Sequence, residues 1–271
     1  MYIPDISHWV PVKDWEIVAQ VCPFMISKAT QGTNFIDSYL YTFVENCEKY
    51  HIPYWLYTFL NPGGERIQAE YMVKVCKPII GPYFRGYVLD VERGNPAAGC
   101  GEALKYINQQ SAKTMFYTYF GQVHLYTKVI EDRGENCAFW EARYGKNNGS
   151  YSMPPHPNAD LHQFTSKGVC PGIGSSVDLN KLTGSLPLEW FTGEPEPMPA
   201  PSKEETMQGL IVYDHKIYYF NIASKIMFHV PNPDALALLK AQYKLEYGKE
   251  IQYMDPAKFD TLKQLIKGKS I

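Results

Sequence analysis

Two acidic residues, Asp90 and Glu92, stand two positions apart at the end of the segment Y-V-L-D-V-E. We expect residues 86–92 to form a β-strand. Alternate side chains of a strand share a face, so both carboxylates would point to one side with their Cα atoms roughly 6.6 Å apart. Two carboxyl groups in one pocket push their pKa values apart, and one of them then stays protonated near neutral pH. Such a pair can carry out glycoside hydrolysis.

The D-x-E spacing alone is a weak signal, because Asp14 and Glu16 repeat it. That second pair lies at the start of a helical pattern, where acidic side chains stabilise the positive end of the helix dipole, so we expect a structural role for it. The structural alternative for Asp90 and Glu92 is a turn at the strand end or an ion pair with Arg93.

Two further acids, Asp5 and Asp178, stand in the first and last predicted strands. Each one alone is explained by a turn or a cap. The first and last strands are neighbours in a closed barrel, however, and the carboxyl ends of barrel strands carry catalytic groups. We therefore predict that Asp5, Asp90, Glu92 and Asp178 converge as one catalytic set.

Aromatic residues also stand late in the predicted strands, at positions whose side chains would point toward one mouth of the barrel. A buried tyrosine hydroxyl or tryptophan N–H needs a polar partner, which favours a partly wet, sugar-binding groove for four of them. These four are Tyr57, Tyr117, Trp140 and Tyr144. We expect Phe59 and Tyr119 to pack in the barrel core instead.

The elements that would position these residues alternate between strands and helices. Strands are predicted at residues 2–6, 24–29, 54–60, 86–92, 114–120, 138–144, 160–164 and 176–178. Helices are predicted near residues 14–20, 38–50, 64–77, 99–111 and 122–132. This α/β order predicts a parallel sheet closed into a barrel related to the (β/α)8 type, with the last helices lost. The alternative is an open doubly wound sheet, although no G-x-G-x-x-G follows the first strand.

A proline-rich segment at residues 193–202 divides the chain, because proline recurs at every second position from 195 to 201. Such a segment forms a semi-rigid spacer between domains. We expect a barrel domain at residues 1–192 and a small α+β domain at residues 203–271. The small domain would hold strands at residues 210–213, 217–221 and 226–230, then helices at 233–247 and 256–267.

Composition narrows the classes of protein. The chain has 271 residues and a net charge of −2, which argues against a nucleic-acid binder. We expect no membrane span and no signal peptide, because the chain lacks a long apolar run and a basic, then apolar, N-terminus. The six cysteines show no C-x-x-C spacing, and we expect free, mostly buried thiols. The seven histidines form no H-E-x-x-H motif, which leaves a zinc amidase or protease with little support.

Five segments, in this order, resemble the lysozymes of glycoside hydrolase family 25, the muramidases common in phage endolysins and bacterial autolysins. They are residues 5–7 (D-I-S), 26–32 (I-S-K-A-T-Q-G), 89–92 (L-D-V-E), 140–144 (W-E-A-R-Y), and 163–173 (Q-F-T-S-K-G-V-C-P-G-I) with 177–180 (V-D-L-N). The resemblance spans roughly residues 2–192. Two positions depart from it: His8-Trp9-Val10 lacks a glutamine common after the first motif, and His162 stands where an aromatic residue is common.

The resemblance implies a (β/α)5(β)3 barrel that cleaves the β-1,4 bond between N-acetylmuramic acid and N-acetylglucosamine in peptidoglycan. It implies that Glu92 is the general acid and that Asp90 orients the acetamido group of the substrate as internal nucleophile. Asp5 and Asp178 would complete the acidic floor, and Tyr57 would support the acetamido group. Gln163 joins the expected substrate-binding residues Tyr57, Tyr117, Trp140 and Tyr144. No metal or cofactor is implied.

For the whole chain the resemblance implies an endolysin made in the host cytoplasm and released to the wall through a separate pore protein. Residues 203–271 would then bind the cell wall. Their aromatic residues would line a glycan site or, equally, form a small core: Tyr213, Tyr218, Tyr219, Phe220 and Phe228. A wall-binding protein without catalysis remains an alternative, as does a chitinase-like glycosidase, although Gly86 and Val88 stand where a D-x-x-D-x-D-x-E motif needs acids.

Overall fold

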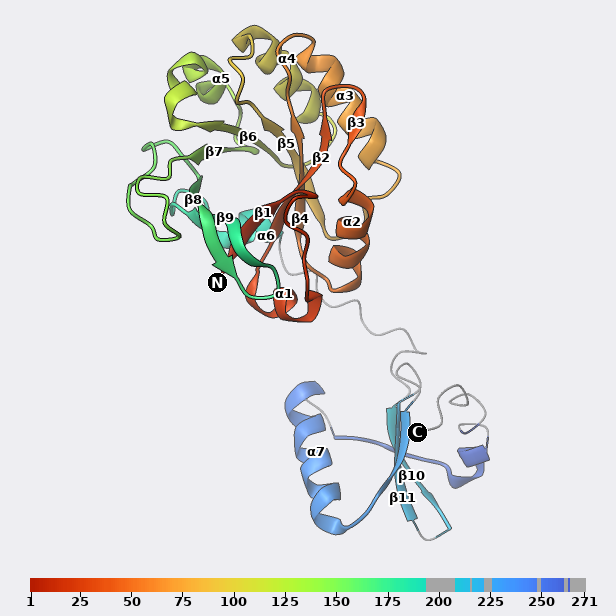
Figure 1. The fold of residues 1–271 in the computed structure, drawn as a ribbon. Helices are drawn as coiled ribbons and strands as arrows, with labels where there is room; N and C mark the ends of the chain where they lie inside the picture. Colours follow the sequence, from red (N-terminus) through yellow and green to blue (C-terminus); the bar gives the residue numbers. More distant parts are fainter. Residues whose placement is uncertain (194–207, 215, 222–225, 248–249, 261–262, 264–271) are drawn as a thin grey trace. The chain divides into compact units, whose positions relative to one another are not determined.

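The computed structural model describes residues 1–193, 208–214, 216–221, 226–247, 250–260 and 263. The chain divides into two compact units, Met1–Pro195 and Glu196–Ile271 (Figure 1). The predicted proline-rich spacer lies outside the described residues from residue 194 onward.

The first unit is a closed barrel of eight strands. They are β1 (Ile3–Ile6), β2 (Met25–Gln31), β4 (Tyr54–Phe59), β5 (Phe84–Asp90), β6 (Thr114–Tyr119), β7 (Cys137–Ala142), β8 (Leu161–Cys170) and β9 (Gly174–Leu182). Neighbouring strands are parallel from β1 to β8, and β9 runs antiparallel to both β8 and β1. Because β1 pairs with both β2 and β9, the sheet closes, which confirms the barrel and excludes the open sheet.

Helices follow the first five barrel strands and lie outside the barrel (Figure 1). They are α1 (Trp15–Val21), α2 (Leu40–Lys49), α3 (Glu65–Cys76), α4 (Ala97–Ile107) and α5 (Thr127–Glu131), the last preceded by a 3-10 helix at Phe120–Leu125. A loop joins β7 to β8 and a turn joins β8 to β9, as expected for a barrel with its last helices lost. The short strand β3 (Phe35–Ile36) pairs with β2 and was not predicted.

Strand alternation divides the core into two layers. Outward side chains such as Leu56 and Leu89 pack against the helices, and inward side chains such as Trp55 and Val88 fill the barrel. One end of the inner layer is completed by α6 (Leu188–Thr192), which the sequence did not predict. Phe191 of α6 is fully buried among these inward side chains. The opposite end of the interior is polar, and the candidate site lies there.

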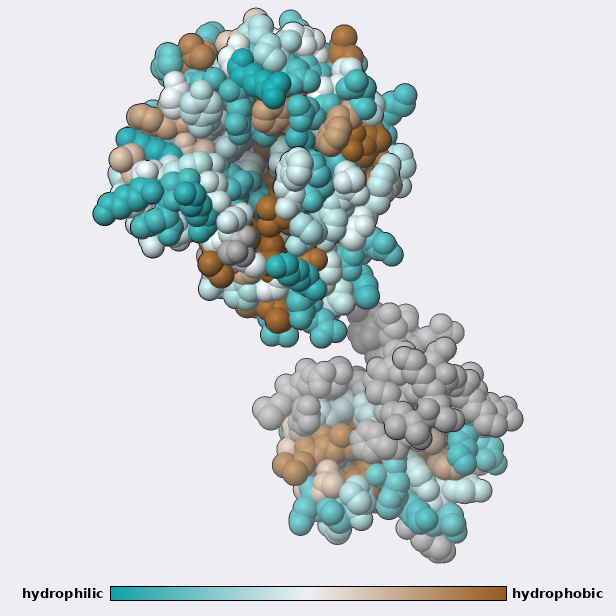
Figure 2. All heavy atoms as spheres, viewed as in Figure 1, coloured by the Kyte–Doolittle hydropathy of each residue, from teal (hydrophilic) through white to brown (hydrophobic). Residues whose placement is uncertain are grey.

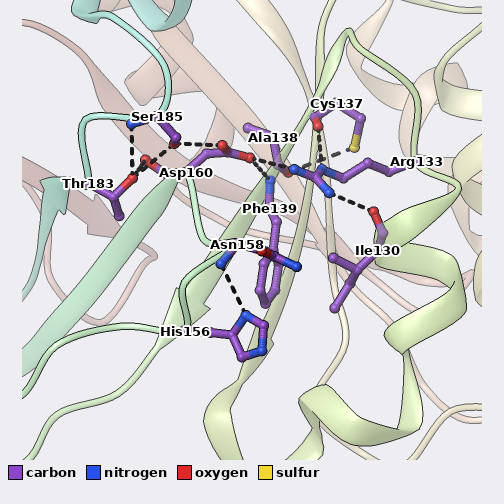
Figure 3. Close-up of polar contacts among 10 residues, drawn as sticks. All are labelled: Ile130, Arg133, Cys137, Ala138, Phe139, His156, Asn158, Asp160, Thr183 and Ser185. Carbon is purple, nitrogen blue, oxygen red and sulfur yellow. Dashed lines mark hydrogen bonds and ion pairs between the residues drawn. The ribbon is translucent and has the colours of Figure 1, made fainter.

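A partly buried ion pair connects the start of β8 to its neighbours (Figure 3). The Asp160 carboxylate accepts hydrogen bonds from Arg133 Nη2 (3.1 Å), the Phe139 backbone N–H (2.7 Å) and the Ser185 hydroxyl (2.7 Å). The Asp160 carbonyl accepts a further bond from the Thr183 hydroxyl at 3.1 Å. The Asp160 side chain therefore connects the loop before β7, β7 itself and the segment after β9.

The second unit has a sheet in the order β12-β11-β10-β13 and one long helix. Its elements are β10 (Gln208–Tyr213), β11 (Lys216–Asn221), β12 (Ile226–Val230), α7 (Pro233–Tyr247) and β13 (Tyr253–Met254). The three predicted strands and the first predicted helix are present. The helix predicted at 256–267 begins as a 3-10 turn at Pro256–Lys258, and much of the rest lies outside the described residues.

Aromatic residues of the second unit divide between core and surface. Phe220 is buried with Ile211 and Phe259 in a small core. Tyr213 stacks on Phe259 with ring centroids 4.0 Å apart, yet stays 42% exposed. The Phe228 side chain lies outside the described part of the chain.

Candidate active site

The structure brings the four predicted acids together at the carboxyl ends of the parallel strands. Asp5 of β1 pairs directly with Asp178 of β9 across the antiparallel ladder. Asp90 is the last residue of β5, and Glu92 lies just beyond the strand rather than within it. The charge of Glu92 raises the pKa values of Asp5, Asp90 and Asp178, so all four carboxyls share one electrostatic environment.

Burial raises the pKa values of three of these acids. Burial is the largest effect at Asp5, where hydrogen bonds from Gln163 and Asn180 oppose it and leave a pKa of about 6. Burial and the charges of Asp5 and Glu92 raise the pKa of Asp178 to about 8. Burial and then the Glu92 charge hold the pKa of Asp90 well above its usual range. The site therefore retains protons near neutral pH that exposed carboxyls would lose.

Gln163 lies behind Asp5 and connects it to two tyrosines. Its amide nitrogen donates to both Asp5 carboxylate oxygens at 3.0 Å. Its amide oxygen accepts from the hydroxyls of Tyr117 (3.0 Å) and Tyr144 (2.6 Å). The side chain is 2% exposed. The amide thus holds three site residues in place and leaves little polar surface for a ligand.

Asn180 makes a parallel set of bonds and was not among the predicted site residues. Its amide nitrogen donates to Asp5 Oδ2 at 2.7 Å, and its amide oxygen accepts from Trp140 Nε1 at 2.7 Å. Trp140 is buried, so its N–H finds a protein partner inside the barrel. The sequence feature that could have predicted Asn180 as a site residue is its spacing from Asp178, because residues two apart on a strand share a face.

The three tyrosines surround the acids. Burial and then the charges of Asp90, Asp5 and Asp178 raise the pKa of Tyr57 well above its usual range. Burial and nearby carboxylates likewise raise the pKa values of Tyr117 and Tyr144. Tyr57 and Tyr144 are partly exposed, whereas Tyr117 is buried. All three hydroxyls therefore stay protonated and able to donate hydrogen bonds to oxygen atoms.

Two aromatic residues expected in the core lie at the rim instead. Phe59 is partly exposed, with Lys28 Nζ and the Arg93 guanidinium each 5.0 Å from its ring centroid. Tyr119 is 39% exposed, and its hydroxyl accepts from Gln122 at 3.0 Å. The expectation of core packing was wrong for both, because each ring lies at the last residue of its strand, beyond the inner apolar layer.

Several residues have structural roles, and for Asp14, Glu16 and the cysteines the sequence predicted this. The Asp14 side chain caps α1 by accepting from the Ile17 backbone N–H at 3.0 Å, and Glu16 lies in the first turn of that helix. His162 is buried, with Nε2 at 2.9 Å from the Arg143 carbonyl oxygen. All six cysteines are free and buried.

The described residues contain neither a candidate metal site nor a candidate membrane-spanning helix. Within them, no three His, Cys, Asp or Glu side chains are grouped as metal ligands. No described helix combines the length and the apolar character that crossing a membrane requires. The face of the barrel unit seen in Figure 2 is mostly hydrophilic, with scattered hydrophobic residues.

Comparison with known proteins identifies the family of this barrel. The model of glycosyl hydrolases family 25 matches residues 4–173. No curated protein sequence matches the chain. The catalytic domain of endolysin ply40 from bacteriophage P40 of Listeria monocytogenes is a similar structure, with TM-score 0.62 and 26% identity over 72% of this chain and 98% of that one.

Two further structures share the fold. They are the bacterial lysozyme from Streptomyces coelicolor (TM-score 0.58, 22% identity, 71% of this chain and 97% of that one) and a muramidase from Trichobolus zukalii (TM-score 0.55, 21% identity, 72% and 100%). The family model covers more than half of the chain, and the barrel presents its acids at the mouth where this fold carries catalysis. The chain therefore belongs to glycosyl hydrolases family 25 and is a glycoside hydrolase.

Proposed function

We propose that this glycoside hydrolase is a lysozyme that cleaves the β-1,4 bond between N-acetylmuramic acid and N-acetylglucosamine in peptidoglycan. The observation that carries the proposal is the gathering of Asp5, Asp90, Glu92 and Asp178 at one barrel mouth, with three of their pKa values raised. A glycosidic bond breaks when its oxygen receives a proton while the developing positive charge on the sugar is stabilised. A cluster of partly protonated carboxyls can do both.

Glu92 acts as the general acid and protonates the leaving oxygen. It is more exposed than Asp90, which suits a group that must meet the glycosidic oxygen. As the carbon–oxygen bond breaks, the acetamido oxygen of the muramic acid residue bonds to the anomeric carbon. Water later displaces that oxygen and gives its proton to the Glu92 carboxylate, which restores the acid.

Asp90 orients the acetamido group. Its Oδ1 atom is buried and has no hydrogen-bond partner among the described residues. An unsatisfied buried acceptor is costly, and a substrate N–H would satisfy it. Tyr57 supports the same group, and the Asp5 carboxylate, with a pKa of about 6, stabilises the cationic intermediate while the Asp178 carboxyl completes the acidic floor beside it.

Mass spectrometry of digested peptidoglycan tests the proposal. Muramic acid at the new reducing ends supports it, whereas glucosamine ends or freed stem peptides overturn it. Chitin oligomers test the chitinase-like alternative, and efficient cleavage of them would favour that alternative. A wall-binding protein without catalysis would pellet with walls and release no reducing ends.

We further propose that the enzyme is a phage-type endolysin, synthesised in the host cytoplasm and released to the wall through a separate pore protein. The second unit would bind the wall and raise the concentration of the barrel at an insoluble substrate. Two exposed tyrosines of that unit support this role, Tyr213 (42% exposed) and Tyr253 (48%). Binding of the Tyr213→Ala/Tyr253→Ala protein to purified walls should fall several-fold while hydrolysis of short soluble glycans stays unchanged.

A further inference from the structure

A pocket near the catalytic acids has no role in the mechanism above. Its volume is about 380 Å³. The lining combines His8 and Trp9, from the segment that lacks the family's common glutamine, with Lys28 and Gln31 of β2, Phe35 of β3, and two asparagines. Lys28 links the pocket to the catalytic centre, because the charges of Asp90 and Glu92 both raise its pKa against the stronger lowering by burial.

One cation, Lys28, lines this pocket, and a second, Arg93, lies next to it in contact with the lining residue Asn61. Lys28 Nζ donates to Gln31 Oε1 at 2.7 Å, and Arg93 Nη1 donates to Asn61 Oδ1 at 3.3 Å. Both cations lie over the ring of Phe59. Neither forms an ion pair with any residue in the described part of the chain. Two neighbouring positive charges held by an aromatic ring and amides form a site for an anion.

An exposed aromatic platform stands beside the cations. Trp9 is 81% exposed and lies against His8, with ring centroids 4.4 Å apart. His8 is fixed in turn, because its Nδ1 lies 2.7 Å from Oδ2 of the fully buried Asp37 side chain. Phe35, 40% exposed, flanks His8 at 6.0 Å between ring centroids. The fold thus presents Trp9 to solvent on a rigid base, and exposed aromatic rings of this kind commonly contact a ligand.

The anion must reach the pocket as part of the substrate. The adjacent carboxylates repel free anions, so the anion has to be delivered by a group bound next to it. In peptidoglycan the carboxylates near the scissile bond belong to the peptide stem on the muramic acid. A peptide also supplies apolar side chains for an aromatic platform and N–H groups for amide oxygens.

Building on the proposed function, we propose that this pocket binds the peptide stem of the substrate. Lys28 and Arg93 pair with a stem carboxylate, and Trp9 with Phe35 packs on stem side chains. The enzyme then prefers glycan that carries peptides with free carboxylates over glycan whose stem carboxylates are amidated.

The test compares soluble glycan chains that carry stem peptides with the same chains after chemical amidation of the stem carboxylates. For the parent protein, kcat/KM should be about tenfold higher on the free-carboxylate substrate, since a charge-assisted contact is worth roughly one factor of ten. In Arg93→Gln that ratio should fall to about 1–2, with the change in KM rather than kcat. Trp9→Ala should raise KM for both peptide-bearing substrates, because its contact does not depend on the carboxylate.

The matched control is Arg66→Gln. Arg66 also lies over an aromatic ring, that of Tyr106 at 4.4 Å, but it belongs to the outer helix α3 and pairs with Glu70. Its variant should keep the parent ratio. Equal parent activity on the two substrates, or an unchanged ratio in Arg93→Gln, would overturn the inference.

Two further outcomes distinguish a wrong ligand assignment from a failure of the proposed function. If the preference exists only on walls that retain phosphate-containing polymers and vanishes on purified glycan–peptide, the pocket binds a phosphate and the peptide assignment is wrong. If the parent leaves no muramic acid at the reducing ends of any substrate, the proposed function itself fails. Cleavage with the expected ends but no preference leaves the proposed function intact and refutes only the peptide pocket.

Discussion

The Gln163 amide donates to both carboxylate oxygens of Asp5, although the two residues are 158 positions apart in the sequence. This contact lowers the pKa of Asp5 against the stronger effect of burial. It also joins β8 to β1 across the mouth of the barrel. The same amide fixes Tyr117 and Tyr144, so one side chain sets both the protonation and the position of its neighbours.

Gln163→Glu tests this relationship with a nearly isosteric change. A carboxylate at this position replaces two donated hydrogen bonds with a second negative charge, so the pKa of Asp5 should rise above about 6. We expect activity at pH 7 to fall at least tenfold and the acidic limb of the pH–rate profile to move upward. Gln20→Glu, on the exposed face of α1, should leave the profile unchanged. An unaltered profile for Gln163→Glu would contradict the role given to this amide.

Glu92→Gln should remove the general acid and keep the fold. Because a positioned acid contributes about 10²–10⁴-fold, we expect a loss of that size in the release of reducing ends. Thermal unfolding should change little, since Glu92 is partly exposed. Glu16→Gln, in the first turn of α1, provides a control that retains activity. A folded Glu92→Gln protein that lyses walls at the parent rate would show that another group donates the proton.

Asp178→Asn should stabilise the barrel at neutral and alkaline pH. The pKa of Asp178 is raised from 3.8 to about 8, so between these values the folded state keeps a proton that the unfolded state has lost. Stability of the parent therefore falls as pH rises from about 4 to about 8, and then levels off. Asparagine does not titrate, so the variant should gain at least about 1 kcal/mol over the parent at pH 8 and nothing from this effect at pH 4.

Denaturant unfolding at both pH values measures this gain. All five tryptophans lie before residue 193, so their fluorescence reports on the barrel unit alone. Activity of Asp178→Asn should fall although the variant is more stable, which would show that Asp178 lowers the stability of the barrel and is needed for catalysis. A variant that is no more stable than the parent at pH 8 would refute the raised pKa.

Asp160→Ala should destabilise the barrel by about 1–3 kcal/mol, because it leaves the buried Phe139 N–H without an acceptor and removes the anionic partner of the partly buried Arg133. The exposed pair Lys128–Asp132 offers a control, and Asp132→Ala should cost much less stability, because solvent screens this surface pair. Tryptophan fluorescence during denaturant unfolding compares the two. Similar losses for both variants would mean that the contacts in Figure 3 contribute no more than a surface ion pair.

The sequence by itself determined the alternation of elements and the strand-end positions of the acids. Strand and helix periods are local properties of the backbone, so they placed Asp90 at the end of β5 and Asp14 at the cap of α1 without any knowledge of distant residues. The order of strands and helices indicated the barrel, and the order of the motifs indicated the family.

Only the tertiary structure decided which amides donate hydrogen bonds to Asp5, and which aromatic rings lie inside the barrel. The contacts of Asp5 with Gln163 and Asn180 span 158 and 175 residues, and they exist only because barrel closure brings β1 beside β9 and near β8. Phe59 and Tyr57 share a face of β4, yet the depth of the inner apolar layer places Phe59 at the rim beneath two cations. A local pattern fixes the direction of a side chain, whereas its depth and its partners depend on elements distant in the sequence.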